Sequence, residues 1–197
     1  MEPIHYHQKI LWVSTSNAGT QEILRKLYES SNNSFDPITS PESNNVVTCY
    51  YTNGAIIQIS LTSIFLDVQA DIDLAQTLSQ STFHGIVFLF DPTNPKSFTA
   101  IQHWYQGNLK WILDIPIVVM SSRQLMVDNG FPNLVPDQDL KQFLQKSEAK
   151  VFIRVSEKFL PDLVEAFQQI GQVCFHPDQA HEEDRIGRED ADPDSEN

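Results

Sequence analysis

The sequence predicts an α/β protein with three layers, in which helices cover both faces of a mostly parallel six-stranded sheet with one antiparallel edge hairpin. Two observations favour this class. Short apolar runs alternate with segments of helical periodicity along most of the chain, which is typical of parallel strands joined by helices. One Asn-Gly pair separates two β-branched runs, as in a tight hairpin. The expected element order is β-α-β-β-α-β-α-β-α-β-α.

The amino-terminal part of the chain reads as strand, loop and helix. Ile10–Val13 is a short apolar strand, and the polar residues Ser14–Gly19 follow it as a loop. We expect Thr20 to cap the next helix. The inward-facing residues of that helix are Ile23, Leu24, Leu27 and Tyr28. The Ser30–Asn45 segment has little periodicity and is interpreted as an irregular loop.

The strongest local signal is the hairpin. Val46–Tyr51 and Ala55–Leu61 are rich in β-branched and aromatic residues, and Thr52-Asn53-Gly54 lies between them. Asn-Gly supplies the positive φ angles that a two-residue turn needs. Leu74 and Leu78 then indicate a short helix.

The second half of the chain repeats the alternation of strands and helices. Gly85–Asp91 is apolar on both faces, as expected for a central strand covered by helices, and Ile115–Met120 is a second such strand. Between them, a helix that opens at Pro95 carries Trp104 at core spacing. The remaining elements are a helix over Asp137–Gln145, a strand over Lys150–Val155 and a helix over Phe159–Ile170. The last helix is expected to bury Leu160, Leu163, Val164, Phe167 and Ile170.

Length and charge limit the functional classes. The 197 residues suit one domain that needs neither disulfides nor a structural metal. The net charge of −13 disfavours binding to nucleic acid or anionic lipid. Residues 177–197 hold nine acids against two arginines, or −7 of that charge, and are expected to be disordered. We divide the chain into an N-terminal extension over 1–7, a domain over 8–172 and an acidic tail over 173–197.

Cysteine usage and hydropathy indicate a cytoplasmic protein. Cys49 and Cys174 have no CxxC spacing, which favours reduced thiols. The amino end lacks the features of a signal peptide, and no apolar run reaches the ~18 residues of a membrane helix. Direct membrane insertion is therefore not expected.

The histidines do not predict a metal site. The pairs His5/His7 and His176/His181 lie near the chain ends without companion cysteines. No Ser or Cys lies in a nucleophile-elbow sequence, so no catalytic residue is assigned.

Three stretches resemble the Ras-like small GTPases. His84–Phe98 looks like the fourth strand and following loop of Rab-type members, and Asp114–Val119 like the fifth strand. Val155–Lys158, followed by Val164–Phe167, resembles the last strand with its Ser-Ala-Lys loop. The resemblance covers about residues 8–171 and implies a P-loop NTPase-type topology.

The phosphate-binding residues of that family are replaced. Ser14–Gln21 occupies the phosphate-loop slot, where the family has Gly-x-x-x-x-Gly-Lys-Ser/Thr. Gly19 is kept, while Thr20 replaces the lysine that contacts phosphate and Gln21 replaces the Mg²⁺ ligand. Ser14, Ser16 and Gly19 could still bind an anion through backbone N–H groups, the alternative being an ordinary strand-to-helix turn.

Two further nucleotide motifs are missing from their expected places. The third strand should end in Asp-x-x-Gly, and Ser60–Ile64 offers neither residue. Ser121–Leu125 stands where the family has Asn-Lys-x-Asp; Arg123 can mimic the lysine, but Leu125 cannot accept a hydrogen bond. We therefore expect no enzymatic activity, no cofactor and no metal.

Other polar and aromatic residues have local interpretations. Asp67, Asp71 and Asp73 precede or open the predicted short helix and are interpreted as its caps. Trp104 is assigned to the core and Trp111 to a protein contact. The Ser30–Asn45 loop and the Thr62–Ala70 stretch occupy the slots of the switch segments and are candidate contact segments.

The layout is most similar to the α- and γ-adaptin-binding family, whose fungal members are called increased-recombination-centres proteins. The similarity lies in the Lys9–Ser14 strand without a phosphate loop, in Cys49–Tyr51 and in Gly85–Phe90. It implies a pseudo-GTPase that binds large or small subunits of clathrin adaptors (AP-1 or AP-2) and acts as a chaperone of adaptor assembly in vesicle-mediated transport. Two alternatives stay open: a divergent nucleotide-binding switch that uses Ser14–Gln21, and a pseudo-GTPase subunit of an unrelated complex.

Overall fold

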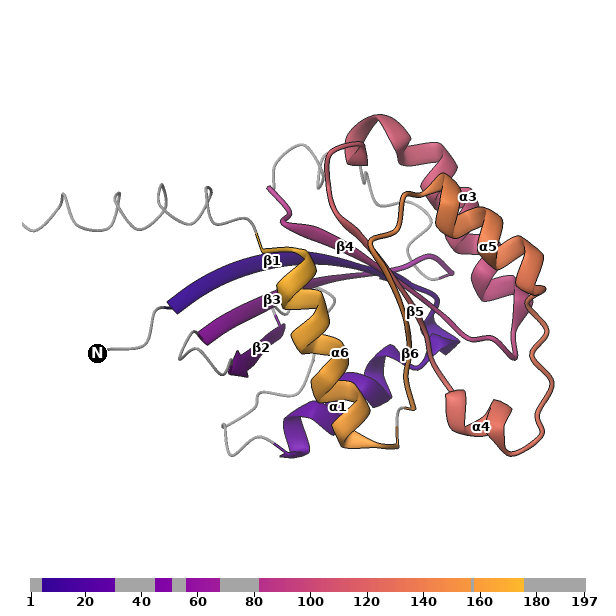
Figure 1. Ribbon diagram of the computed structural model, residues 1–197, viewed down its shortest axis with the longest axis horizontal. Helices are drawn as coiled ribbons and strands as arrows, with labels where there is room; N and C mark the ends of the chain where they lie inside the picture. Colours follow the sequence, from indigo (N-terminus) through magenta and orange to yellow (C-terminus); the bar gives the residue numbers. More distant parts are fainter. Residues whose placement is uncertain (1–4, 31–44, 51–55, 68–81, 157, 176–197) are drawn as a thin grey trace, which may run out of the picture.

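The computed structural model describes residues 5–30, 45–50, 56–67, 82–156 and 158–175. Its centre is a sheet with strand order β2-β3-β1-β4-β5-β6 (Figure 1). The pairings β1–β3, β1–β4, β4–β5 and β5–β6 are all parallel, and β2 pairs antiparallel with β3. The strand bounds are β1 His5–Ser14, β2 Asn45–Tyr50, β3 Ile56–Phe65, β4 Gly85–Phe90, β5 Ile117–Ser121 and β6 Val151–Arg154. The α/β class and the parallel sheet are as the sequence predicts.

Several predicted features lie outside the described residues. These are the hairpin turn at 51–55, the short helix around Leu74 and Leu78, and the residues of the acidic tail beyond Phe175. Of the Ser30–Asn45 loop, only its first and last residues are described, as parts of α1 and β2.

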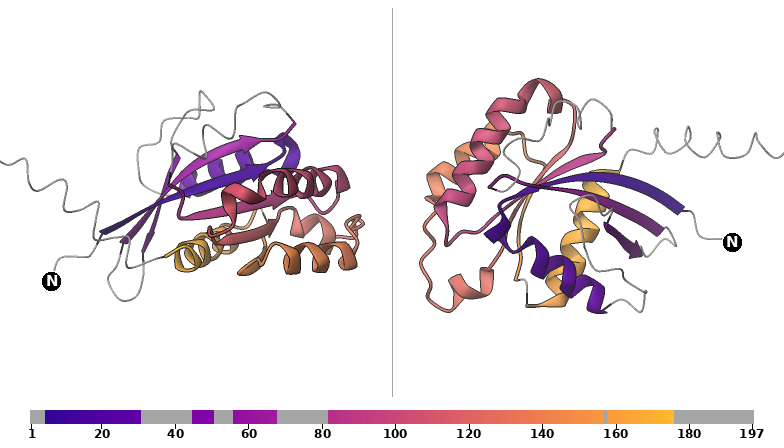
Figure 2. Two further views of the ribbon diagram at one scale, coloured as in Figure 1. Left: turned by 90° about the horizontal axis from the view of Figure 1, so that it is seen from above. Right: turned by 180° about the vertical axis from the view of Figure 1, so that it is seen from behind.

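Helices flank the sheet on both faces (Figures 1 and 2). Helices α1 and α6 lie side by side against one face, and α3 and α5 lie together against the other. The helix bounds are α1 Thr20–Ser30, α3 Pro95–Ile112, α4 Gln124–Asp128, α5 Asp137–Lys146 and α6 Leu160–Val173. Within the described part of the chain, no helix is both long and apolar enough to cross a lipid bilayer.

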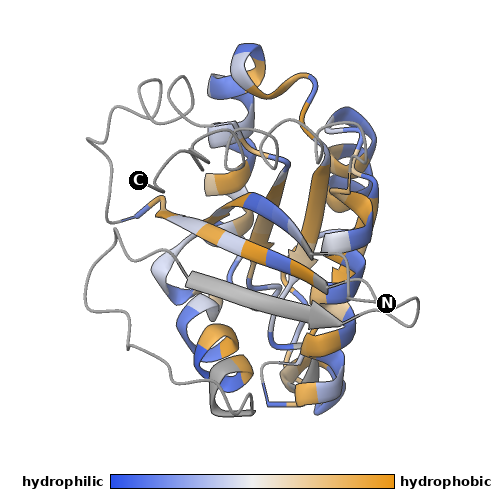
Figure 3. Ribbon diagram, turned by 90° about the vertical axis from the view of Figure 1, so that its left-hand side faces the viewer, coloured by the Kyte–Doolittle hydropathy of each residue, from blue (hydrophilic) through white to orange (hydrophobic). Residues whose placement is uncertain are grey.

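The hydrophobic core has two layers because the central strands are apolar on both faces. In β1, Ile10 and Trp12 pack under α1 and α6, whereas Leu11 and Val13 pack on the opposite side. Every residue of β4 is buried. Figure 3 shows the apolar strands at the centre of the sheet, between the helices. Such a core holds the carboxyl ends of the parallel strands at one edge, where the loops after β1, β4, β5 and β6 meet.

The sheet begins earlier in the chain than the sequence indicates. β1 starts at His5, so residues 5–7 belong to the sheet and not to an N-terminal extension. They are extended because each has a parallel partner in β3, beginning with His5 opposite Ile56. The predicted strand was limited to the apolar run Ile10–Val13 and so left out residues 5–7, which pairing with β3 keeps extended.

The domain also ends later than the predicted boundary at residue 172. α6 runs to Val173, the Cys174 side chain is buried, and the Phe175 ring packs edge-on against Tyr6 with 4.8 Å between ring centroids. Val164 was predicted to face inward but is 43 % exposed. Its neighbour Leu163 is the buried residue, and consecutive side chains of a helix point in different directions. Helix α4, which the sequence analysis did not predict, follows β5 directly.

Candidate functional site

The loop after β1, which the sequence predicts to fill the phosphate-loop slot, leads directly into α1. Residues Ser16–Ala18 form one 3₁₀ turn, and Gly19 follows with φ of 88°, a left-handed conformation that glycine adopts without strain. The Gly19 carbonyl accepts the Ile23 N–H at 3.0 Å and so begins the helical hydrogen-bond pattern. Gly19 therefore supplies the left-handed residue through which the chain enters α1.

The Thr20 side chain does not cap α1, contrary to the prediction. Its hydroxyl is completely buried and lies 2.8 Å from the Ser14 hydroxyl. It also accepts a hydrogen bond from the Trp12 indole N–H at 3.1 Å. The position at which the resembled family has a lysine is thus a neutral group that ties α1 to β1.

Asp67 closes the same loop from the end of β3. The strand continues to Phe65, four residues beyond the predicted end, because it stays paired with β1, and the Leu66 N–H still donates to the Ser14 carbonyl at 2.8 Å. The Asp67 carboxylate accepts the Ser16 N–H at 2.7 Å and the Ser16 hydroxyl at 2.5 Å. An acid therefore does follow the third strand and bonds to the loop after β1, a role that the sequence did not assign to it. The Asp-x-x-Gly motif stays absent, because Ala70 stands where the glycine would be. The short helix that Asp67 was predicted to cap lies outside the described residues.

The hydrogen bonds to Ser16 set the charge state of Asp67. Partial burial raises the pKa of its carboxyl group, but hydrogen bonds from the Ser16 hydroxyl, the Ser16 N–H and its own backbone outweigh that effect and leave the pKa below its ordinary value. The loop accordingly holds a carboxylate anion supplied by the chain itself. This negative charge contacts a backbone N–H of the kind that phosphate loops offer to phosphate.

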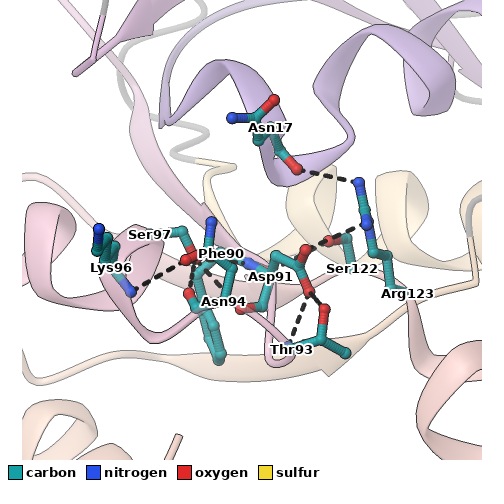
Figure 4. Close-up of polar contacts among 9 residues, drawn as sticks. All are labelled: Asn17, Phe90, Asp91, Thr93, Asn94, Lys96, Ser97, Ser122 and Arg123. Carbon is teal, nitrogen blue, oxygen red and sulfur yellow. Dashed lines mark hydrogen bonds and ion pairs between the residues drawn. The ribbon is translucent and has the colours of Figure 1, made fainter. Parts of the chain in front are cut away.

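Arg123 joins the loops after β1, β4 and β5 (Figure 4). Its Nε lies 3.3 Å from Oδ2 of Asp91, and its Nη2 donates to the Asn17 carbonyl at 3.2 Å. The residue adopts a φ of 57°, uncommon for a non-glycine residue, as the chain turns from β5 into α4. The basic residue that the sequence suggested as a lysine mimic is thus held by the protein's own acid and carbonyl.

Asp91 is a buried acid whose oxygens all face protein donors. It is 3 % exposed, and Oδ1 accepts both the Thr93 N–H at 2.8 Å and the Thr93 hydroxyl at 2.7 Å. The Ser97 hydroxyl accepts the Asp91 N–H at 3.0 Å, and the Asn94 side chain caps α3 (Figure 4). The sequence placed Asp91 at the end of a strand but indicated no role for it. The feature that could have indicated one is the single acid at the end of the apolar run Gly85–Phe90.

The other residues in the slots of the nucleotide motifs are described only in part. Gln21, in the Mg²⁺-ligand slot, is exposed. Ser122 donates to the Phe90 carbonyl at 3.3 Å and lies against Gly19. The backbone of Leu125 is part of α4, and its side chain lies outside the described residues, as do Asp71 and Asp73.

The remaining sequence assignments are distributed over the surface and the core. Trp104 is buried, as predicted. Trp111 is 40 % exposed beneath Lys110, and its assignment to a protein contact stays a prediction. His7 was expected near a flexible end; it lies instead in β1, with Nε2 2.7 Å from the Ser60 hydroxyl. Among the described residues, no three His, Cys, Asp or Glu side chains are grouped to hold a metal ion.

Comparison with known proteins adds no relative. No protein-family model matches the chain, and no curated protein matches it with significance. The residues at this edge of the sheet are therefore the basis for the function proposed below.

Proposed function

We propose that the chain is a non-catalytic, small-GTPase-like interaction module, a pseudo-GTPase that acts by binding other proteins in the cytoplasm. The observation that carries this proposal is the contact between Asp67 and Ser16, which gives a phosphate-loop N–H to an internal carboxylate. A nucleotide phosphate at this N–H would have to displace that carboxylate and would be repelled by it.

Two further contacts favour the same function. Thr20 replaces the cation that a phosphate loop uses, and its hydroxyl is already engaged with Trp12 and Ser14. Arg123, the possible mimic of the Asn-Lys-x-Asp lysine, is paired with Asp91. A divergent nucleotide-binding switch would need to break both arrangements.

For the partner, we propose clathrin adaptor subunits, large or small, whose assembly for vesicle-mediated transport the module would assist. This part of the proposal comes from the resemblance in Lys9–Ser14, Cys49–Tyr51 and Gly85–Phe90 to the adaptin-binding family. A role as a subunit of an unrelated complex uses the same features and differs only in the partner.

The decisive test is thermal unfolding of the purified chain with Mg²⁺ and GTP, GDP or ATP, with inorganic phosphate as the control for a general anion effect. A nucleotide present at ~100 times its Kd would stabilise the fold by ~2.7 kcal/mol and raise Tm by several degrees. We expect no nucleotide-specific shift. A shift with GTP or GDP but not with phosphate would establish the switch and overturn the proposal.

The partner is tested separately with the immobilised chain and purified adaptor subunits. Saturable capture of a large or small subunit supports the adaptor assignment. If no adaptor subunit is captured and no nucleotide changes Tm, the remaining hypothesis is an interaction module that belongs to an unrelated complex.

A further inference from the structure

A groove lies between α3 and α5, on the face of the sheet opposite α1 and α6. Its volume is about 330 Å³. One wall consists of Gln102, Tyr105, Gln106 and Leu109 of α3. The spacing of these four residues places them in one stripe along the helix.

The second wall is a matching stripe of α5, made of Asp139, Gln142, Phe143 and Lys146. Phe143 is buried and packs edge-on against Phe98 and Tyr105, with ring centroids 5.5 and 5.6 Å apart. The Tyr105 hydroxyl donates to the Lys146 carbonyl at 2.8 Å, which fixes one helix against the other. The walls are therefore held in place by the fold without an added ligand.

The shape and lining of the groove suit a third helix. Two ridged helices side by side leave a furrow that accepts the apolar ridge of another helix, one of the common modes of peptide recognition. Phe143, Leu109 and the Tyr105 ring supply apolar lining, and the three glutamine amides of the lining can bond polar groups of an occupant. The apolar edge continues outward, because Leu109 is 38 % exposed and Leu113, one turn later, is 76 % exposed.

The charges along the groove define the occupant. Asp139 lies in the first turn of α5 and Lys146 in the last, on the same stripe, so they are about 10 Å apart along the axis. A complementary helix carries a basic residue opposite Asp139 and an acidic residue opposite Lys146. In a helix antiparallel to α5, these are its last and first turns, where the helix dipole also favours them.

We propose that the groove between α3 and α5 binds an amphipathic helix of a partner protein that runs antiparallel to α5, with an acidic first turn, an apolar ridge and a basic last turn. The inference rests on the proposed function as an interaction module. The groove is a different surface from the two contact segments that the sequence suggested, Ser30–Asn45 and Thr62–Ala70, because it is formed by α3 and α5.

The test uses the full chain and a labelled synthetic helix of about four turns, cross-linked so that it stays helical, with leucines at i, i+3, i+4 and i+7. One peptide has glutamate in its first turn and lysine in its last; the control peptide has the two exchanged. Fluorescence anisotropy measures both dissociation constants. We expect saturable binding of the first peptide and about 10-fold weaker binding of the control.

Variants of the groove make the test specific. The Asp139→Lys, Lys146→Asp double variant should reverse the preference between the two peptides, while circular dichroism checks that it is folded. Leu109→Asp, at a position already partly exposed, should weaken both peptides. Equal affinities for the two peptides, or no saturable binding up to ~1 mM, would overturn the proposal.

Two results would assign the groove to another occupant and so also overturn it. One is a dimer of the chain that Leu109→Asp converts to a monomer in light scattering, which would mean that a second copy fills the groove. The other is displacement of the labelled helix by a peptide of residues 177–197. None of these outcomes depends on nucleotide binding or adaptor capture, so the interaction-module proposal can survive the failure of the groove.

Discussion

The carboxylate of Asp67 accepts hydrogen bonds from both the backbone N–H and the hydroxyl of Ser16, and so joins the end of β3 to the loop after β1. The contact depends on strand register. Because the Leu66 N–H still pairs with the Ser14 carbonyl beyond the end of β3, the next residue, Asp67, lies beside the loop. The same geometry that closes the loop also makes the stability of this edge dependent on pH.

The first prediction concerns Asp67→Asn. The folded-state pKa of Asp67 lies below its ordinary value of 3.8, so the carboxylate contributes stability above that pH and loses it as the pH falls through the folded pKa. At neutral pH the variant should be less stable by about 1 kcal/mol or less, since the site is exposed to solvent. Urea unfolding at a series of pH values should show this difference shrinking below pH 3.8.

The control for Asp67→Asn is the Ser16→Ala variant, alone and combined with it. Ser16→Ala removes the hydroxyl that donates to Asp67 and keeps the backbone N–H, so the effects of the two substitutions should add only in part. Additive effects at neutral pH would mean that the hydrogen bond from the Ser16 hydroxyl does not stabilise the folded protein.

The second prediction concerns the buried hydroxyl of Thr20. Thr20→Val keeps the shape of the side chain but leaves the Trp12 indole N–H without its acceptor, which should cost about 1–3 kcal/mol. Thr20→Ser retains the hydroxyl and should cost less. Denaturant unfolding of the two variants measures the difference; equal losses would show that only packing matters at this position.

Much of the fold could be predicted from the sequence because its signals are local. The apolar run Gly85–Phe90 and the Pro95 helix start correspond to β4 and α3 as the structure has them. Strand ends were harder to predict. Residues 5–7 and 62–65 are largely polar or mixed, and they are extended because β1 and β3 pair along their whole length.

The site was less predictable than the fold because its contacts join distant parts of the chain. Thr20 and Gly19 lie in a recognisable loop, so their slots could be assigned. The contact of Asp67 with Ser16 was missed because the third strand was predicted to end at Leu61. The apolar run Ile64-Phe65-Leu66 before the acid was the signal that could have extended the strand. The bridge from Arg123 to Asn17 spans 106 residues, and no local pattern indicates it.

The third prediction concerns the pair Arg123 and Asp91. Arg123→Ala leaves a buried carboxylate without its cation, although Thr93 still donates to it, and should cost about 2 kcal/mol after discounting for the partly exposed arginine. In Asp91→Asn the charge to be balanced is gone, so Arg123→Ala should cost less in that background. A double-mutant cycle by chemical denaturation measures the coupling, and a coupling near zero would contradict the role of the pair.

The fourth prediction concerns Gly85, where β4 begins under the end of α6. A Cβ atom at this position would overlap the Cys174 Sγ and lie 3.1 Å from the Ile10 Cδ1, so Gly85→Ala should destabilise the protein by at least ~2 kcal/mol. The matched control is Gly107→Ala in the exposed part of α3, where a Cβ would meet nothing within 4 Å and should stabilise the helix by about 0.5–1 kcal/mol.

Variants of Cys174 test whether its side chain causes the loss of stability in Gly85→Ala. Removing its sulfur in Cys174→Ala should cost ~1 kcal/mol alone, yet relieve part of the Gly85→Ala strain, because the closest contact then becomes Cβ against Cβ at 3.0 Å. Thermal unfolding of the single and double variants measures this coupling. If the double variant is no more stable than the sum of the single effects predicts, the cost of Gly85→Ala comes from the β4 backbone, and the end of α6 does not pack on β4 as closely as these contacts require.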